Sequence, residues 1–168
     1  KIKCHYFMKG SEMKKFVYLL SVFLLSMSPV KIFADAHEEK FGTAEEAEQI
    51  LTRAVNLVKS NETVAFAMIT AGMGGLMTKD LYPFCTSMDG VMAAHPYSAG
   101  LDMGDFTSTD GVKVAKIMLK NARVGKISKV TYKLGRPSGT DLSSEEFKKT
   151  ALYTKVGNFV CASGFYSK

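Results

Sequence analysis

Residues 81–96 read LYPFCTSMDGVMAAHP, and this stretch decides the fold. Two apolar runs, 81–88 and 91–95, flank the pair Asp89-Gly90. An Asp-Gly pair between apolar runs is the strongest short-range signal for a β-hairpin, because both turn positions favour positive φ. The stretch therefore predicts two antiparallel strands joined by a tight turn.

Helical patterns lie on both sides of this hairpin. Thr43-Ala-Glu-Glu46 has the form of a capping box, and it precedes apolar residues at helical spacing. A second helical piece is expected over 64–70. A third helix is expected after a loop over 96–109. Its inward-facing residues would be Val114, Ala115, Met118, Leu119 and Ala122.

The carboxyl-terminal third reads as three more strands. Residues 126–134 (KISKVTYKL) alternate between apolar and polar side chains, and 136–141 read as a turn. Runs 151–156 and 159–166 flank a tight turn at Gly157-Asn158. The order of elements predicts one α+β domain with an antiparallel sheet.

The amino end has the form of an export signal. In residues 13–36, a basic start, an apolar core and the triplet Ala34-Asp35-Ala36 are typical of a secretory signal peptide. We expect cleavage after Ala36 and a periplasmic or secreted domain over 37–168; an uncleaved anchor is the alternative. Residues 1–12 precede this signal as an extension of unknown status.

The charge and the cysteine content limit the classes of function and partner that the sequence supports. The formal net charge is +6, of which +4 lies in the first 36 residues, so the remaining 132 residues are near +2. The basicity therefore gives no argument for a nucleic-acid partner. Two cysteines remain beyond the signal, Cys85 and Cys161, and in an exported domain they suggest one disulfide. Two buried free thiols are the alternative.

Several short motifs occur in an order that is similar to a known family. They are Asp80-Leu-Tyr-Pro-Phe84 with Asp89-Gly90 and Ala94-His95-Pro96, Gly100-Leu-Asp102, Ser108-Thr-Asp110-Gly111-Val-Lys113, Val130-Thr-Tyr132 with Arg136-Pro137, Lys149-Thr-Ala-Leu-Tyr153, and Gly164-Phe-Tyr166. In this order they resemble the single Cache sensor domain, the extracytoplasmic relative of the PAS fold. Lys129 stands where the family commonly has tryptophan, Leu134 replaces a frequent aromatic, and Pro83 replaces a valine. Since Pro83 has no amide donor, it is expected at a sheet edge or a bulge.

The resemblance implies a PAS-like five-stranded antiparallel sheet with a long amino-terminal helix and a helix-bearing crossover. It also implies a pocket on one sheet face, closed by residues 97–122, for a short organic acid or an amino acid. The family is usually fused to a membrane helix and a signalling output. Because little follows Tyr166, we expect a free exported binding domain. A membrane receptor and a homodimer through the amino-terminal helix are the protein partners that the resemblance suggests.

His95 has three candidate roles: it ends a strand, it contacts a ligand, or it acts in catalysis. A general base needs an acid, a nucleophile or a metal nearby, and no HxxE, HExxH or GxSxG pattern surrounds His95. We therefore expect no catalytic residue, metal or cofactor. An enzyme remains the third hypothesis, behind a small-molecule-binding domain and a structural or protein-interaction module whose pocket is filled by its own side chains.

The expected ligand contacts combine aromatic bodies, polar tips and a cation for a carboxylate. For the tyrosines, plain core is the equal alternative, and for the two cations the alternative is an exposed surface position. Met88 shares a strand face with Tyr82 and is expected in the core. The candidate contacts are Tyr82, Phe84, His95, Met103, Lys129, Tyr132, Arg136 and Tyr153.

Overall fold

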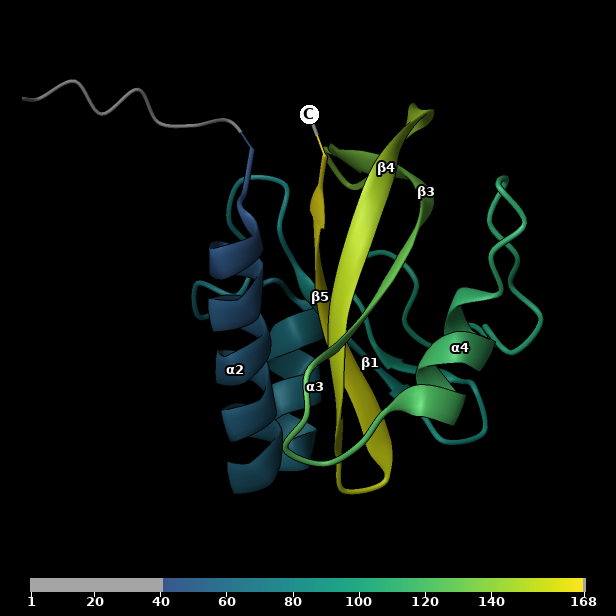
Figure 1. Ribbon diagram of the computed structural model, residues 1–168. Helices are drawn as coiled ribbons and strands as arrows, with labels where there is room; N and C mark the ends of the chain where they lie inside the picture. Colours follow the sequence, from purple (N-terminus) through teal and green to yellow (C-terminus); the bar gives the residue numbers. More distant parts are fainter. Residues whose placement is uncertain (1–40, 168) are drawn as a thin grey trace, which may run out of the picture. The chain divides into compact units, whose positions relative to one another are not determined.

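The capping box forms as the sequence predicts. In the computed structural model, which describes residues 41–167 (Figure 1), helix α2 spans Ala44–Ser60. Thr43 Oγ1 accepts a hydrogen bond from Glu46 N at 3.2 Å, and Glu46 Oε2 accepts one from Thr43 N at 2.9 Å. The predicted signal peptide and the extension before it lie outside the described residues.

The second helix follows directly. Asn61 ends α2 and caps α3 (Glu62–Thr70) by accepting a hydrogen bond from Val64 N. No helix among the described residues is long and apolar enough to cross a membrane.

Five strands form one antiparallel sheet, as predicted. They are β1 (Pro83–Ser87), β2 (Met92–Ala94), β3 (Ser128–Ser138), β4 (Asp141–Val156) and β5 (Phe159–Tyr166), in the order β2-β1-β5-β4-β3.

The two faces of the sheet are covered differently. Helices α2 and α3 lie on one face, and α4 (Val114–Asn121) lies on the other with the segment that leads into it (Figure 1). Each face has its own apolar cluster, because successive side chains of a strand point to opposite faces. Phe84 and Tyr132 belong to the α4 side, while Cys85 and Leu152 belong to the α2 side.

The predicted disulfide is confirmed. Cys85 of β1 and Cys161 of β5 are direct partners across two neighbouring strands, and their sulfur atoms are bonded. Both residues are fully buried on the α2 side of the sheet. The bond therefore ties the amino-terminal hairpin to the last strand, across 76 residues of chain.

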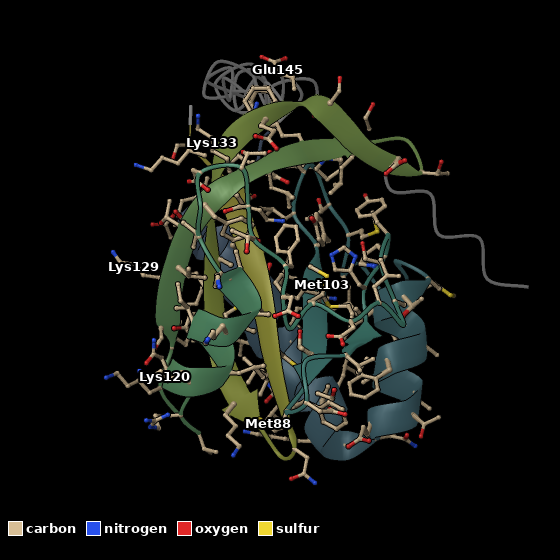
Figure 2. All side chains as sticks on the ribbon, turned by 90° about the vertical axis from the view of Figure 1, so that its right-hand side faces the viewer. Met88, Met103, Lys120, Lys129, Lys133 and Glu145 are labelled. Atoms are coloured by element: carbon tan, nitrogen blue, oxygen red, sulfur yellow. A yellow bond between two sulfur atoms is a disulfide. The ribbon has the colours of Figure 1, made fainter. Side chains whose placement is uncertain are left out.

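The hairpin forms, but its first strand is shorter than predicted. The strand pairing shifts between Cys85 and Thr86, β1 ends at Ser87, and the Gly90 amide closes the turn on the Ser87 carbonyl. The expectation that Met88 lies in the core was therefore wrong: it sits in the turn with 42% of its surface exposed (Figure 2). Of the two turn residues, only Gly90 has a positive φ, of 98°.

Pro83 occupies the kind of position expected of it. It is the first residue of β1 and pairs with Ser163 of β5 on one side, while the β2 pairing reaches no further than Cys85. Its missing amide donor therefore interrupts no ladder on the β2 side.

The turn predicted over 136–141 forms, but it is narrower than expected and comprises Gly139 and Thr140. Arg136 and Pro137 belong to β3, and β4 begins at Asp141 rather than at Ala151. The pairing shifts between Gly135 and Pro137, and such a bulge accommodates a proline inside a strand. The first part of β4 could not be recognised in the sequence, because its residues are mostly polar and do not alternate between apolar and polar side chains.

Candidate functional site

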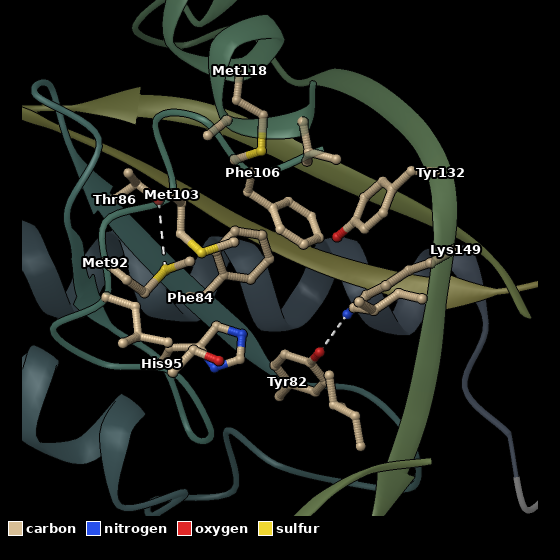
Figure 3. A pocket seen from close by; sticks show the side chains of 16 residues that line it. Tyr82, Phe84, Thr86, Met92, His95, Met103, Phe106, Met118, Tyr132 and Lys149 are labelled. Atoms are coloured by element: carbon tan, nitrogen blue, oxygen red, sulfur yellow. Dashed lines mark hydrogen bonds between the residues drawn. The ribbon is translucent and has the colours of Figure 1, made fainter. Parts of the chain in front are cut away.

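A cavity of about 250 Å³ lies between the sheet and the segment that covers it (Figure 3). The sheet side contributes Tyr82, Phe84, Thr86, Met92, His95, Tyr132, Leu134, Leu142 and Lys149. The cover contributes Ser98, Leu101, Met103, Phe106, Val114, Ala115 and Met118.

Backbone hydrogen bonds hold the cover to the hairpin. Met92 N donates to Leu101 O, Gly100 N donates to Met92 O, and Met103 N donates to Gly90 O. Gly100 has a φ of 85°, which a residue with a side chain rarely adopts. These bonds place Met103 against the cavity without any regular secondary structure.

A second anchor joins the cover to β3. Asp110 Oδ1 accepts hydrogen bonds from Ser108 Oγ at 2.5 Å and from Lys133 N at 3.2 Å. Thr109 adds a hydrogen bond to Glu146 of β4. The motif around Asp110-Gly111 thus fixes the start of α4 relative to the sheet.

Lys149 is the polar residue that sets the character of the cavity. Its side chain is fully buried, and its Nζ donates a hydrogen bond to the Tyr82 hydroxyl at 2.7 Å (Figure 3). Burial lowers the pKa of Lys149 from 10.5 to about 7, and the negative charge of Asp80 opposes this shift. An anion entering the cavity would stabilise the charged form of this amine.

Lys149 is not among the contacts predicted from the sequence, although it lies in the Lys149–Tyr153 motif. Lys148 and Lys149 stand side by side in a polar stretch, and lysine side chains are normally exposed. The period of two from Tyr153 and Ala151 could have shown that Lys149 shares their buried face.

His95 is a buried, neutral imidazole at the cavity. Its Nδ1 accepts a hydrogen bond from Tyr97 N at 2.9 Å, and its ring lies 5.2 Å from that of Tyr82. Burial, and secondarily the charge of Lys149, lowers the pKa of His95 to about 3. Because Nδ1 accepts, the single proton of the neutral ring is on Nε2, which makes that atom a donor.

Two tyrosine hydroxyls also border this region. Burial raises the pKa of Tyr82 well above its usual value, and the nearby Tyr166 and Tyr132 add to the effect. Burial likewise raises the pKa of Tyr132. Both phenols are therefore protonated and can donate or accept hydrogen bonds.

The structure brings five of the eight predicted contacts to the cavity: Tyr82, Phe84, His95, Met103 and Tyr132. Tyr153 is buried in the apolar cluster on the same face but does not line the cavity. Lys129 is exposed on β3 and points away from the sheet (Figure 2).

Arg136 also lies outside the cavity lining, in a structural arrangement of its own. Its guanidinium carbon is 4.0 Å from the ring centre of Phe41 and 4.2 Å from that of Phe147. Its Nε lies 3.6 Å from Asp80 Oδ2, and Asp80 Oδ1 accepts a hydrogen bond from Gly42 N. This arrangement connects the segment before α2 to the far end of the β3–β4 pair.

The described residues show no group of three His, Cys, Asp or Glu side chains that could hold a metal ion. The polar groups at the cavity are an amine, a neutral imidazole and hydroxyls. This set suits the binding of a small anion by charge and hydrogen bonds.

Comparison with known proteins gives similarity of structure but not of sequence. No protein-family model matches the chain, and no curated protein does. A methyl-accepting chemotaxis protein from Vibrio parahaemolyticus is 15% identical with a TM-score of 0.58, over 94% of this chain and 97% of that one. The periplasmic sensor domain of a chemotaxis protein is 18% identical with a TM-score of 0.54, over 74% and 90%.

A third structure is a Cache chemosensory domain whose description concerns carboxylic acid recognition. It is 18% identical with a TM-score of 0.54, over 96% of this chain and 100% of that one. All three share the antiparallel sheet described above, as the motif resemblance implied. This chain therefore has the PAS-like fold of a single Cache-type sensor domain.

Proposed function

We propose that this protein is an exported binding domain that takes up a short organic acid or an amino acid through its carboxylate and signals the bound state to a membrane receptor. The observation that carries the proposal is the buried amine of Lys149 at a cavity of about 250 Å³. A buried cation without a counterion is costly, and a bound carboxylate would compensate that cost.

Several hydrogen-bond donors at the cavity are available to a bound carboxylate. An ammonium carries three donors, and among the described residues Lys149 gives one to the Tyr82 hydroxyl. We assign the two others to the oxygen atoms of the anion. His95 Nε2 and the Tyr132 hydroxyl are further donors at the same cavity.

The alternative of a structural module required a pocket filled by its own side chains. The open cavity counts against that alternative, because an interior normally contains few voids larger than a water molecule. No geometry in the cavity favours bond-breaking chemistry over binding.

A thermal-shift panel tests the proposal. A selective ligand raises the melting temperature in proportion to the logarithm of its concentration above its Kd. We expect stabilisation by at least one small carboxylate, its loss in Lys149→Met, and its retention in Lys148→Met, where the neighbouring exposed lysine is changed instead. A flat response across organic acids and amino acids would reject the function.

A further inference from the structure

We infer that the ligand is a monocarboxylate with an uncharged apolar tail about as large as an aromatic ring or a six-carbon chain, and not an amino acid or a dicarboxylate. The inference rests on the proposed function and specifies its ligand. It depends on three properties of the cavity: its charges, the chemistry of its far wall and its volume.

The cavity offers one cation and no anion. Among the described residues that line it, Lys149 is the one charged side chain, and no Asp or Glu is present. Asp80, whose negative charge acts on Lys149, does not line the cavity and is engaged by Arg136 and by Gly42 N. The ammonium group of an amino acid would therefore be buried without a counterion.

The second carboxylate of a diacid would likewise be buried without a counterion. Arg136 is held between two aromatic rings outside the lining, and Lys129 is exposed on the other side of β3. His95 resists protonation, since its surroundings hold its pKa near 3. Among the described residues that line the cavity, no second positive charge is available to a diacid.

The wall away from Lys149 is apolar. It comprises Met92 of β2 together with Met103, Phe106, Val114 and Met118 of the cover. Figure 3 labels Met92, Met103, Phe106 and Met118 in this part of the cavity. In this region the Thr86 hydroxyl donates a hydrogen bond to the Met92 sulfur at 3.6 Å. Flexible thioether side chains adapt to an apolar ligand of irregular shape.

The volume sets the length of the tail. An apolar cavity of about 150 Å³ is enough to bind benzene, and this cavity measures about 250 Å³. Acetate would leave most of that space empty. Each further buried CH₂ group of a ligand tightens binding about fourfold, so hexanoate should bind on the order of 10²-fold more tightly than acetate.

Calorimetric titration of the purified protein with a matched set tests the inference. The set is acetate, hexanoate, norleucine (hexanoate with an α-ammonium group), adipate (hexanoate with a second carboxylate) and hexanamide (the uncharged analogue). We expect hexanoate to bind at least about 30-fold more tightly than norleucine, adipate or hexanamide, because each of these leaves a buried charge unpaired.

Two variants locate the tail and the head group. Ala115→Leu extends a side chain into the cavity from α4 and should weaken hexanoate at least tenfold while leaving acetate unchanged; the exposed neighbour Lys116→Leu is the control. Lys149→Met should lose hexanoate and keep hexanamide, which also reports that the cavity is intact.

The failures of the two proposals can be distinguished. If norleucine or adipate binds as tightly as hexanoate, or if acetate does, this inference is overturned while the proposed function stands. If none of the acids binds, both are overturned.

Discussion

Gly164 of β5 lies directly beneath the aliphatic stem of Lys149 on β4. A Cβ atom at position 164 would come within 2.5 Å of Cε of that lysine. The two residues belong to separate motifs in the sequence, yet their contact decides where the amine points. The lack of a side chain at 164 gives Lys149 its path to the Tyr82 hydroxyl.

Gly164→Ala should therefore displace the amine. We expect a loss of carboxylate affinity of about tenfold, with a small change in unfolding free energy because the far end of a lysine can move. Titration calorimetry measures the affinity. Ser163→Ala is the control: this residue is buried next to Gly164, and its hydroxyl has no hydrogen-bond partner within residues 41–167. Equal effects of the two changes would contradict the prediction.

The buried amine should give stability a specific pH dependence. The pKa of Lys149 is about 7 in the folded protein and 10.5 ordinarily, so the unfolded chain binds more protons between these values. The free energy of unfolding should rise from about pH 7 to pH 9. In Lys149→Met this rise should vanish, and stability at pH 7 should increase by at least about 1 kcal/mol. Urea denaturation at several pH values tests this, with Lys148→Met as the control.

His95 should make the fold sensitive to mild acid. Its pKa is about 3 when folded, against 6.5 ordinarily, so the stability present above pH 6.5 is lost as the pH falls toward 3. Between pH 6.5 and 4.5, before most carboxylates titrate, we expect a loss of about 1–2 kcal/mol. His95→Asn should flatten this part of the profile, as followed by thermal melts. An unchanged slope in that variant would show that other groups cause the sensitivity.

Arg136 should prove structural. Arg136→Lys removes the planar group that lies against Phe41 and Phe147 and is expected to lower the unfolding free energy by about 1–2 kcal/mol. Ligand affinity should change less than twofold, since Arg136 does not line the cavity. The exposed Arg123→Lys serves as the control. A large loss of affinity would instead assign Arg136 to the ligand, as the sequence reasoning allowed.

The disulfide should contribute strongly to stability. Replacing both Cys85 and Cys161 with alanine is expected to lower the unfolding free energy by about 2–5 kcal/mol, because the bond closes a long loop in the unfolded chain. Chemical denaturation with and without a reductant measures this. The reductant should destabilise the native protein and leave the double variant unchanged.

The order and type of elements could be predicted from the sequence because each has a local signal. The capping box at Thr43 and Glu46 and the Asp89-Gly90 turn depend on residues a few positions apart. Met88 was misassigned because β1 ends at Ser87 and Met88 lies in the turn, although the alternation holds as far as Thr86. Where a strand ends depends on its pairing with the partner strand, which a single segment does not reveal.

The candidate site was predictable where an aromatic or apolar residue follows strand alternation, as at Tyr82, Phe84 and Tyr132. Lys129 and Arg136 are the cations that the sequence suggested, whereas the amine at the cavity belongs to Lys149. A lysine is normally exposed, so its burial has to be inferred from the space that Gly164 provides on another strand.

The two ends of the cavity are built from different parts of the fold, which should differ in how well they tolerate substitutions. The cationic end comes from a sheet whose strands are cross-linked by a disulfide, whereas the apolar end comes largely from the cover, which consists of an irregular segment followed by α4. Substitutions within that segment can therefore alter which tail is accepted without disturbing the carboxylate anchor. This separation makes the domain a promising starting scaffold for engineered biosensors that distinguish acids by their chain.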